Sequence, residues 1–190
     1  MKEKRVRSLA SLSKPQGNAC LPARQGLDST SQSHNPEKAR AYAFLLLKFR
    51  LRSENELKAR LKQKGFSSEL AESTVDFLKE KEFIDDRVFA KGWVSSRLKR
   101  PLGLRKIKQE LVQKGLAKEV IRDALAQVNE DYPESQIVSQ LAKQRFSKLK
   151  NIDPLKAKAR VYGYLMRRGF SPDVVGEVIR SVSLKGNGPI

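Results

Sequence analysis

The chain has 190 residues, with 39 Lys and Arg against 21 Asp and Glu, which gives a formal net charge of +18 and a pI near 10.2. A charge this large favours anionic partners: nucleic acid, an acidic protein face or an anionic membrane surface. No run of apolar residues is long enough for a membrane-spanning helix. Cys20 is the single cysteine, which excludes an internal disulfide and a thiolate metal cluster.

Residues 1–35 differ in composition from the rest of the chain. They are rich in Ser, Gly, Pro, Gln and Asn, and they carry six Lys and Arg against two acids. We therefore expect a mostly disordered basic tail, without the apolar core of a signal peptide. An organelle transit peptide and a dispensable bacterial extension are both open interpretations, and we favour the second.

From Pro36 onward, apolar residues recur at three- and four-residue spacing, which predicts helices throughout. Three segments align without gaps around a glycine that follows a basic residue and precedes a large apolar one. These anchors are Lys64-Gly65-Phe66, Lys114-Gly115-Leu116 and Arg168-Gly169-Phe170. Apolar residues stand at fixed offsets on both sides of each glycine, so the pattern predicts two helices joined at a left-handed glycine.

The apolar positions shared by the three segments lie eight and four residues before the glycine and five and ten residues after it. In the order of the segments they are Leu57, Ile107 and Val161; Leu61, Leu111 and Leu165; Leu70, Val120 and Val174; Val75, Leu125 and Ile179.

Each segment has room for one more helix in front. We expect these helices at residues 37–51, 86–99 and 134–148. The sequence thus predicts an all-α fold of three tandem three-helix repeats that form an elongated, curved array, because stacking buries apolar faces that a lone helix pair could not bury. The expected repeats are 36–82, 83–130 and 131–185.

Several helix starts carry capping signals. Ser53 and Glu56 form a capping-box pattern, and Ser67 and Ser171 stand where N-caps are expected. The corresponding residue of the second repeat is Ala117, so we expect a weaker helix start there.

Asp85 and Asp86 are adjacent carboxylates at the expected start of a helix. Such a pair could bind a metal or share a proton, but no further ligand or base stands nearby, and the single histidine, His34, lies in the tail. A helix cap and a favourable interaction with the helix dipole explain both residues. We favour this interpretation, and we expect no catalytic residue, metal or cofactor.

Two basic regions are candidates for binding a partner or DNA. The first runs from Arg97 to Lys108 and contains no acid. Its like charges repel one another unless a partner neutralises them. The alternative is that these residues form only a solvated face. The second runs from Lys143 to Arg168 with Asp153 as its only acid. The candidate binding residues are Arg97, Lys99, Arg100, Arg105, Lys106, Lys108, Lys143, Arg145, Lys148, Arg167 and Arg168.

The stretch IDDRVFAKGWVSSR, followed by GLRKIKQELVQKG, resembles the central signature of the RecX regulatory proteins, and RSENELKARLKQKGF is similar to their first repeat. The resemblance covers about residues 38–183 and is most specific from Ser53 to Gly115. It implies three tandem three-helix repeats in a monomeric, non-enzymatic protein of the bacterial cytoplasm. It also implies binding to the RecA recombinase and its single-stranded DNA filament, with inhibition of the ATPase, coprotease and strand-exchange activities.

The tail before Pro36 departs from the compact pattern of that family. The residues themselves match no phosphate loop, metal-ligand motif or activated nucleophile, so an enzyme is the least favoured class. The high positive charge leaves direct DNA contact open. The alternative function is therefore a stand-alone nucleic-acid-binding helical protein that acts through phosphate contacts.

Overall fold

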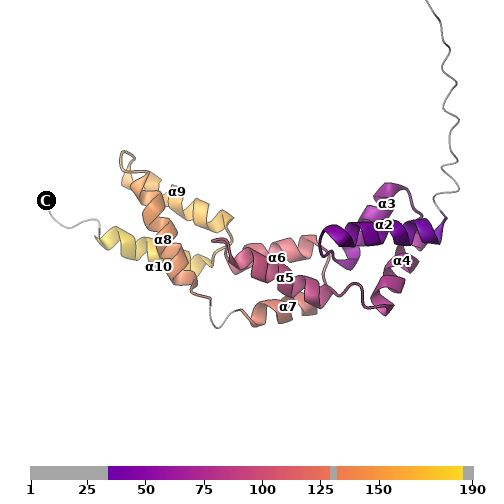
Figure 1. Cartoon of the computed structure of the whole chain (residues 1–190). Helices are drawn as coiled ribbons and strands as arrows, with labels where there is room; N and C mark the ends of the chain where they lie inside the picture. Colours follow the sequence, from indigo (N-terminus) through magenta and orange to yellow (C-terminus); the bar gives the residue numbers. More distant parts are fainter. Residues whose placement is uncertain (1–33, 129–131, 186–190) are drawn as a thin grey trace, which may run out of the picture.

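The computed structural model describes residues 34–128 and 132–185, and all regular secondary structure in these ranges is α-helical. The helices are α2 (Pro36–Phe49), α3 (Glu54–Lys64), α4 (Ser68–Glu80), α5 (Asp86–Leu98), α6 (Leu104–Gln113), α7 (Lys118–Ala126), α8 (Glu134–Ser147), α9 (Pro154–Arg167) and α10 (Pro172–Lys185) (Figure 1).

The helices form three groups of three, which we call repeat 1 (α2–α4), repeat 2 (α5–α7) and repeat 3 (α8–α10). Each group has its own cluster of buried apolar side chains, and the extensive helix–helix contacts all lie within a group. The three groups follow one another in an elongated, bent array (Figure 1). The predicted fold of three tandem three-helix repeats is confirmed.

The helix before each turn glycine buries the residues that the repeat pattern predicts. The apolar side chains four and eight residues before the glycine are fully buried in all three repeats. After the glycine the pattern shifts by one residue: Val120 and Val174 are only half-buried, whereas Ile121 and Val175, one position further on, belong to the core. In repeats 2 and 3 the residue six positions after the glycine, rather than the residue five positions after it, therefore faces the core.

The turn glycines have the left-handed conformation that the sequence predicts. Gly65, Gly115 and Gly169 have φ values of 101°, 76° and 81°. The residue after each glycine donates its N–H to the carbonyl of the leucine four residues before the glycine, at 3.2, 3.3 and 3.5 Å. This is the bonding of a Schellman motif, and it satisfies carbonyls that the helix end leaves free.

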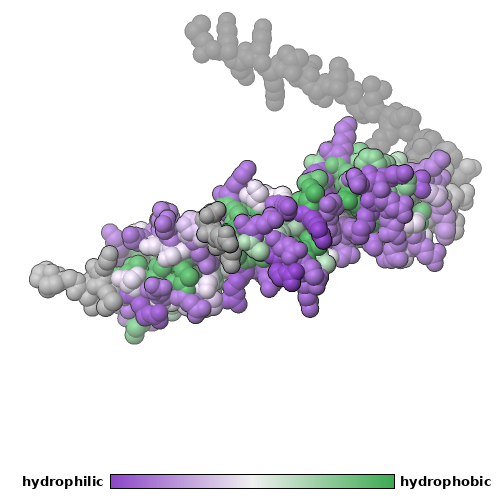
Figure 2. All heavy atoms as spheres, turned by 90° about the horizontal axis from the view of Figure 1, so that it is seen from below, coloured by the Kyte–Doolittle hydropathy of each residue, from purple (hydrophilic) through white to green (hydrophobic). Residues whose placement is uncertain are grey.

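The described part of the chain begins close to the expected end of the tail. Residues 1–33 of the expected disordered tail lie outside the described residues, and Asn35 already caps α2 by accepting from the N–H of Lys38 (3.1 Å). None of the described helices has the length and apolar character needed to cross a membrane. Seen from below, the surface is largely hydrophilic, with hydrophobic patches between the charged side chains (Figure 2).

Candidate nucleic-acid interface

Repeats 2 and 3 meet where the loop between α5 and α6 lies against the turn between α9 and α10. The N–H of Gly103 donates to the carbonyl of Arg168 (2.9 Å), and the N–H of Arg105 donates to the carbonyl of Gly169 (3.2 Å). The Arg168 guanidinium donates in return to the carbonyl of Pro101 (2.9 Å). We call this contact the second joint.

Tyr132, just before α8, adds a hydrogen bond to the second joint. Its hydroxyl donates to the carbonyl of Leu102 (2.6 Å). Burial is the larger cause, and the negative charge of Glu134 the smaller cause, of a raised pKa of Tyr132. The hydroxyl therefore keeps its proton and its role as a donor at neutral pH.

The second joint depends on two glycines that lack side chains. A Cβ atom at Gly103 would overlap the carbonyl of Gly169, and a Cβ atom at Gly169 would overlap Lys106. The two backbones can approach this closely only because neither residue has a Cβ.

Repeats 1 and 2 meet in a related way, at a contact that we call the first joint. Ser53 occupies in repeat 1 the position that Gly103 occupies in repeat 2. Its hydroxyl donates to the carbonyl of Lys114 (2.8 Å), and the side-chain amide of Asn55 donates to the carbonyl of Gly115 (2.9 Å). Ser53 and Asn55 of the first joint thus correspond to Gly103 and Arg105 of the second joint, and both pairs donate to equivalent carbonyls. The donors are side chains in the first joint and backbone N–H groups in the second.

The two adjacent aspartates have separate capping roles. Asp85 is the N-cap of α5 and accepts from the N–H groups of Arg87 (2.6 Å) and Val88 (3.4 Å), as predicted. The half-buried carboxylate of Asp86 accepts from the N–H of Glu54 (3.0 Å), the first residue of α3, and so belongs to the first joint. Burial is the main cause that raises the pKa of Asp86.

Glu56 lies at the centre of an ion-pair network in the first joint. Its carboxylate accepts hydrogen bonds from Arg50 and from Lys114 (3.0 Å). Desolvation alone would raise the pKa of Glu56, but these two cations lower it to about 2. The capping box is thus only half formed: Ser53 accepts from the N–H of Glu56 (3.2 Å), while the carboxylate binds cations rather than the backbone of Ser53.

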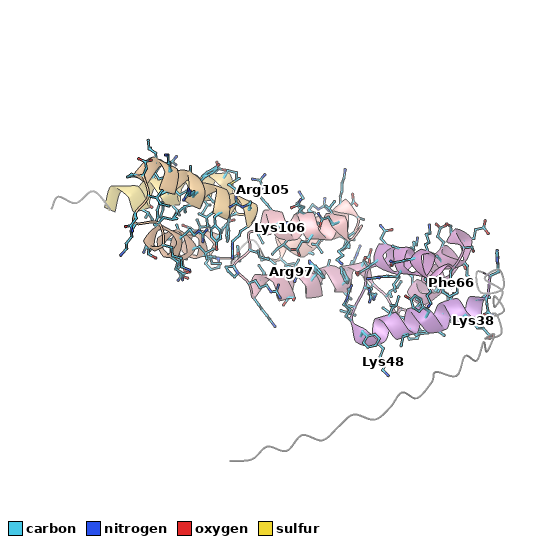
Figure 3. The ribbon with its side chains drawn as sticks, turned by 90° about the horizontal axis from the view of Figure 1, so that it is seen from above. Lys38, Lys48, Phe66, Arg97, Arg105 and Lys106 are labelled. Carbon is cyan, nitrogen blue, oxygen red and sulfur yellow. The ribbon has the colours of Figure 1, made fainter. Side chains whose placement is uncertain are left out.

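Cations from both predicted basic regions meet at the second joint. Lys99, Arg100 and Arg105 are exposed at the end of α5 and the start of α6, and Arg168 binds Pro101 and Gly103 in the loop between them. Arg105 and Lys106 lie at the end of repeat 2 that faces repeat 3 (Figure 3). We call the following set the basic joint: Lys99, Arg100, Arg105, Lys106, Arg145, Arg167 and Arg168.

An aromatic ring links two of these cations. The guanidinium groups of Arg145 and Arg168 lie 5.0 Å and 4.8 Å from the centre of the Tyr164 ring. Arg145, Arg160 and Arg167 also line a cleft of about 430 Å³ in repeat 3. The basic joint therefore continues from α6 onto α8 and α9.

The other candidate residues lie elsewhere. Arg97 is held by its own repeat, because its Nε donates to Glu110 (2.6 Å) and its guanidinium stacks 4.2 Å from the centre of the Trp93 ring. Lys108 lines a groove between α6 and α7. Lys143 and Lys148 are in α8 and at its C-terminal end, outside the contacts described above.

Two residues of this surface escaped the sequence-based choice. Arg160 stands two helical turns before Arg167 on α9, so helical spacing could have placed both on one face. Tyr164 lies between two arginines that are separated by more than twenty residues in the sequence. Arg168 stands four residues after Tyr164, which is a local helical spacing, but no local pattern in the sequence could have revealed the contact with Arg145.

Among the described residues, no group of three or more His, Cys, Asp and Glu could hold a metal ion. Models of the first, second and third three-helix domains of RecX match residues 39–78, 85–125 and 134–179. These matches cover all three repeats.

Curated relatives and solved structures agree with these matches. The regulatory protein RecX of Chlorobium limicola is 35% identical over 147 residues, which are 77% of this chain and 90% of the relative. That of Mycobacterium sp. strain JLS is 34% identical over 85% of this chain and 90% of the relative. These relatives are named as regulatory proteins and not as enzymes.

A crystal structure of a regulatory protein RecX is 26% identical, with a TM-score of 0.67 over 75% of this chain and 70% of the other. The fold is also that of RecX from Lactobacillus salivarius, at 21% identity and a TM-score of 0.67 over 78% of this chain and 97% of the other. With three matching domains in the right order and relatives of this similarity, the chain belongs to the RecX family of regulatory proteins.

Proposed function

We propose that this chain is a monomeric, non-enzymatic regulator in the bacterial cytoplasm that binds the RecA recombinase and its single-stranded DNA filament. In this proposal it inhibits the ATPase, coprotease and strand-exchange activities of RecA. Membership of a regulatory family supports the role. The observation that carries the proposal is the basic joint, where cations from two distant parts of the sequence meet at one contact between repeats.

The basic joint has the chemistry of a phosphate-binding surface. Arginine is suited to phosphate because its planar guanidinium can donate two parallel hydrogen bonds. Arg145 and Arg168 are pre-oriented by the Tyr164 ring, which reduces the side-chain entropy that binding must remove. Lys99, Arg100 and Arg105, which are exposed on the repeat 2 side of the second joint, add positive charge.

The test compares two variants that remove the same number of positive charges. The first carries Lys99→Gln, Arg100→Gln, Arg105→Gln and Arg167→Gln in the basic joint. The control carries Lys38→Gln, Lys48→Gln, Arg60→Gln and Lys81→Gln, four exposed residues of repeat 1. We would titrate each variant against the DNA-dependent ATPase of RecA and measure affinity for single-stranded DNA at several salt concentrations.

The basic-joint variant should no longer inhibit, whereas the control should retain most of its inhibition. For every phosphate that the variant no longer neutralises, the slope of log affinity against log salt should fall by about 0.7 for a single strand. Equal effects in both variants would show that only net charge matters. Full inhibition by the basic-joint variant would remove this surface from the proposal.

The arginine cleft in repeat 3 favours a second candidate function, that of a stand-alone nucleic-acid-binding protein. The two functions differ in stoichiometry. A regulator of the filament should inhibit the ATPase at amounts well below one molecule per RecA, whereas a competitor for DNA should inhibit only when it covers the DNA. A pull-down of RecA without DNA separates them further, because only the regulator should bind RecA alone.

A further inference from the structure

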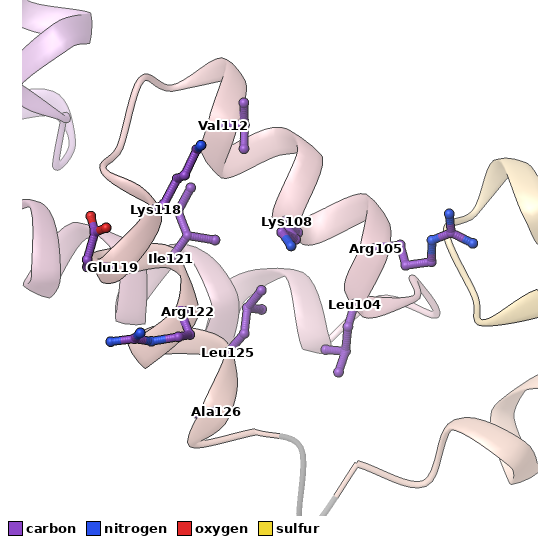
Figure 4. A pocket seen from close by; sticks show the side chains of 10 residues that line it. All are labelled: Leu104, Arg105, Lys108, Val112, Lys118, Glu119, Ile121, Arg122, Leu125 and Ala126. Atoms are coloured by element: carbon purple, nitrogen blue, oxygen red, sulfur yellow. The ribbon is translucent and has the colours of Figure 1, made fainter.

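Repeat 2 has a groove of about 690 Å³ between α6 and α7, and Arg105, whose N–H belongs to the second joint, lines one end of it. Its apolar lining includes Leu104, Ile121 and Leu125, and Val112 stands at its edge with 56% of its surface exposed (Figure 4). A pocket with an apolar floor, a few charged groups and a volume in this range is typical of ligand- and peptide-binding sites.

The corresponding place in repeat 1 is bridged by an ion pair. Lys62 of α3 and Glu72 of α4 form a salt bridge of 3.8 Å across the two helices. The repeat pattern puts Val112 and Arg122 at these two positions of repeat 2. The ion pair cannot form in repeat 2, because Val112 stands in place of the lysine and Arg122 stands in place of the glutamate.

The outward-facing residues of the second helix differ between repeats 1 and 2 at both ends of the helix. In repeat 1 they are Glu54, Lys58 and Lys62, and in repeat 2 they are Leu104, Lys108 and Val112. Two charged positions have become apolar and the central lysine has remained. Leu104 is half-buried against the core of repeat 2, whereas Val112 is exposed. An exposed apolar residue beside an apolar groove is typical of a protein-binding surface.

The edge of the groove is positively charged. The lining cations are Arg105, Lys108, Lys118 and Arg122, and Glu119 is the acid among the lining residues. Val112 and Lys118 both line the groove, and Arg105 lines its end nearest to repeat 3 (Figure 4). The groove therefore combines an apolar strip with cations along its rim.

We propose that this groove binds an acidic amphipathic helix of a partner protein. Leu104 and Val112 stand eight residues apart on α6, which corresponds to about 12 Å. A bound helix of two to three turns could cover that length, with apolar residues at i, i+4 and i+7 in the groove and carboxylates directed at Lys108 and Lys118.

Charge argues against the other occupants. The segment of residues 1–35 is itself basic, and a second copy of the chain carries the same +18, so both would be repelled. Nucleic-acid phosphates would pair with the lysines but would leave the apolar strip uncovered. An acidic helix with an apolar face matches both features.

The test uses a defined probe and a matched pair of variants. The probe is a fluorescein-labelled 16-residue peptide with leucines at i, i+4 and i+7 among glutamates and alanines, and fluorescence anisotropy with the full chain measures binding. Val112→Glu places an acid in the groove. Val88→Glu is the control, because Val88 lies on α5 of the same repeat, is 53% exposed and does not line the groove.

We expect saturable binding of the probe with a Kd of roughly 10 μM, weakened about tenfold or more by Val112→Glu and less than about twofold by Val88→Glu. Lys118→Glu is a second variant, at a helix start where an acid is tolerated, and it should also weaken binding. Circular dichroism confirms that each variant is folded.

Three results would overturn the proposal. The first is absence of saturable binding by the probe, and the second is equal binding of a peptide with the same composition but scattered leucines. The third is an equal drop in single-stranded DNA affinity in the Val112→Glu variant, which would make the groove a nucleic-acid surface. The groove is tested with Val112→Glu and Lys118→Glu, which lie outside the basic joint, and RecA inhibition is measured on the basic-joint variant. Failure of either proposal therefore leaves the other open to test.

Discussion

Single charged residues in this protein have two different roles that composition alone does not separate. Arg97 and Glu110 bind each other, and both bind Trp93, whose indole N–H donates to Glu110 (3.0 Å). Lys114 lies 5.0 Å from the centre of the same ring and also binds Glu56. These charges stabilise the first joint and the core of repeat 2, whereas the exposed cations of the basic joint are available to a partner.

Glu56 should make stability depend on pH in the acid range. Its folded-state pKa of about 2 lies below its ordinary value of 4.5, so the ionised form contributes stability at neutral pH. That contribution should disappear as the pH falls from about 4.5 towards 2, because the unfolded chain binds the proton first. Glu56→Gln should flatten this part of the curve of unfolding free energy against pH, measured by urea unfolding.

The same substitution should lower stability at pH 7 by about 1–3 kcal/mol, because it removes charged hydrogen bonds from Arg50 and Lys114. Glu72→Gln is the control, since the Lys62–Glu72 pair is largely exposed and such pairs contribute little. If both variants showed the same pH dependence as the parent protein, the network around Glu56 would have no role in acid stability.

At the scale of single helices, the start of α7 lacks the side-chain cap that the related start of α4 has, so we expect it to be the weaker of the two. Ser67 accepts from the N–H of Leu70 (3.2 Å) at the start of α4, whereas Ala117 offers no side-chain acceptor to α7. The backbone at Ala117 (φ −64°, ψ 147°) closely matches that at Ser67 (φ −61°, ψ 156°). A serine at this position would therefore be placed to cap the helix.

Ala117→Ser should raise the free energy of unfolding by about 1 kcal/mol, the typical contribution of an N-cap. Thermal and urea unfolding would measure the change. Ala126→Ser adds the same hydroxyl at the last residue of α7, where no free N–H group needs an acceptor, and it should give no gain. An equal gain from both variants would exclude capping as the cause.

At the scale of the whole molecule, the two joints determine how the repeats follow one another. Both use the same positions of the repeat, but in the second joint the backbone itself makes the contacts, because Gly103 stands where the first joint has Ser53. The basic joint depends on these contacts, since they place Arg105 and Lys106 beside the turn that carries Arg168. The second joint thus sets both the course of the array between repeats 2 and 3 and the position of the proposed binding surface.

Gly103→Ala should open the second joint, because the added methyl group would overlap the carbonyl of Gly169. We expect a destabilisation of about 1–3 kcal/mol, a larger radius of gyration by small-angle scattering and weaker inhibition of RecA, with helicity retained. Gly92→Ala is the control: its Cβ would meet Leu51 at 3.8 Å, an ordinary contact, and alanine favours the helix. Unchanged scattering by the Gly103→Ala variant would show that the joint tolerates the methyl group.

The sequence by itself determined the repeat fold. The helices, their Schellman turns at Gly65, Gly115 and Gly169, and the buried leucines before these glycines all depend on contacts between residues close in the chain. Such contacts leave a periodic signal, and three aligned copies make that signal stronger. The cap at Asp85 was predictable for the same reason.

Only the tertiary structure decided which charges act together. The joints pair residues about sixty positions apart, such as Ser53 with Lys114 and Gly103 with Arg168, and no local pattern specifies such a distance. A lysine or arginine looks the same in the sequence whether it stacks on a ring, as Arg97 does, or projects from a joint, as Arg105 does. Packing between elements separates these roles, because it determines which side chains find a partner within the protein and which remain available to another molecule.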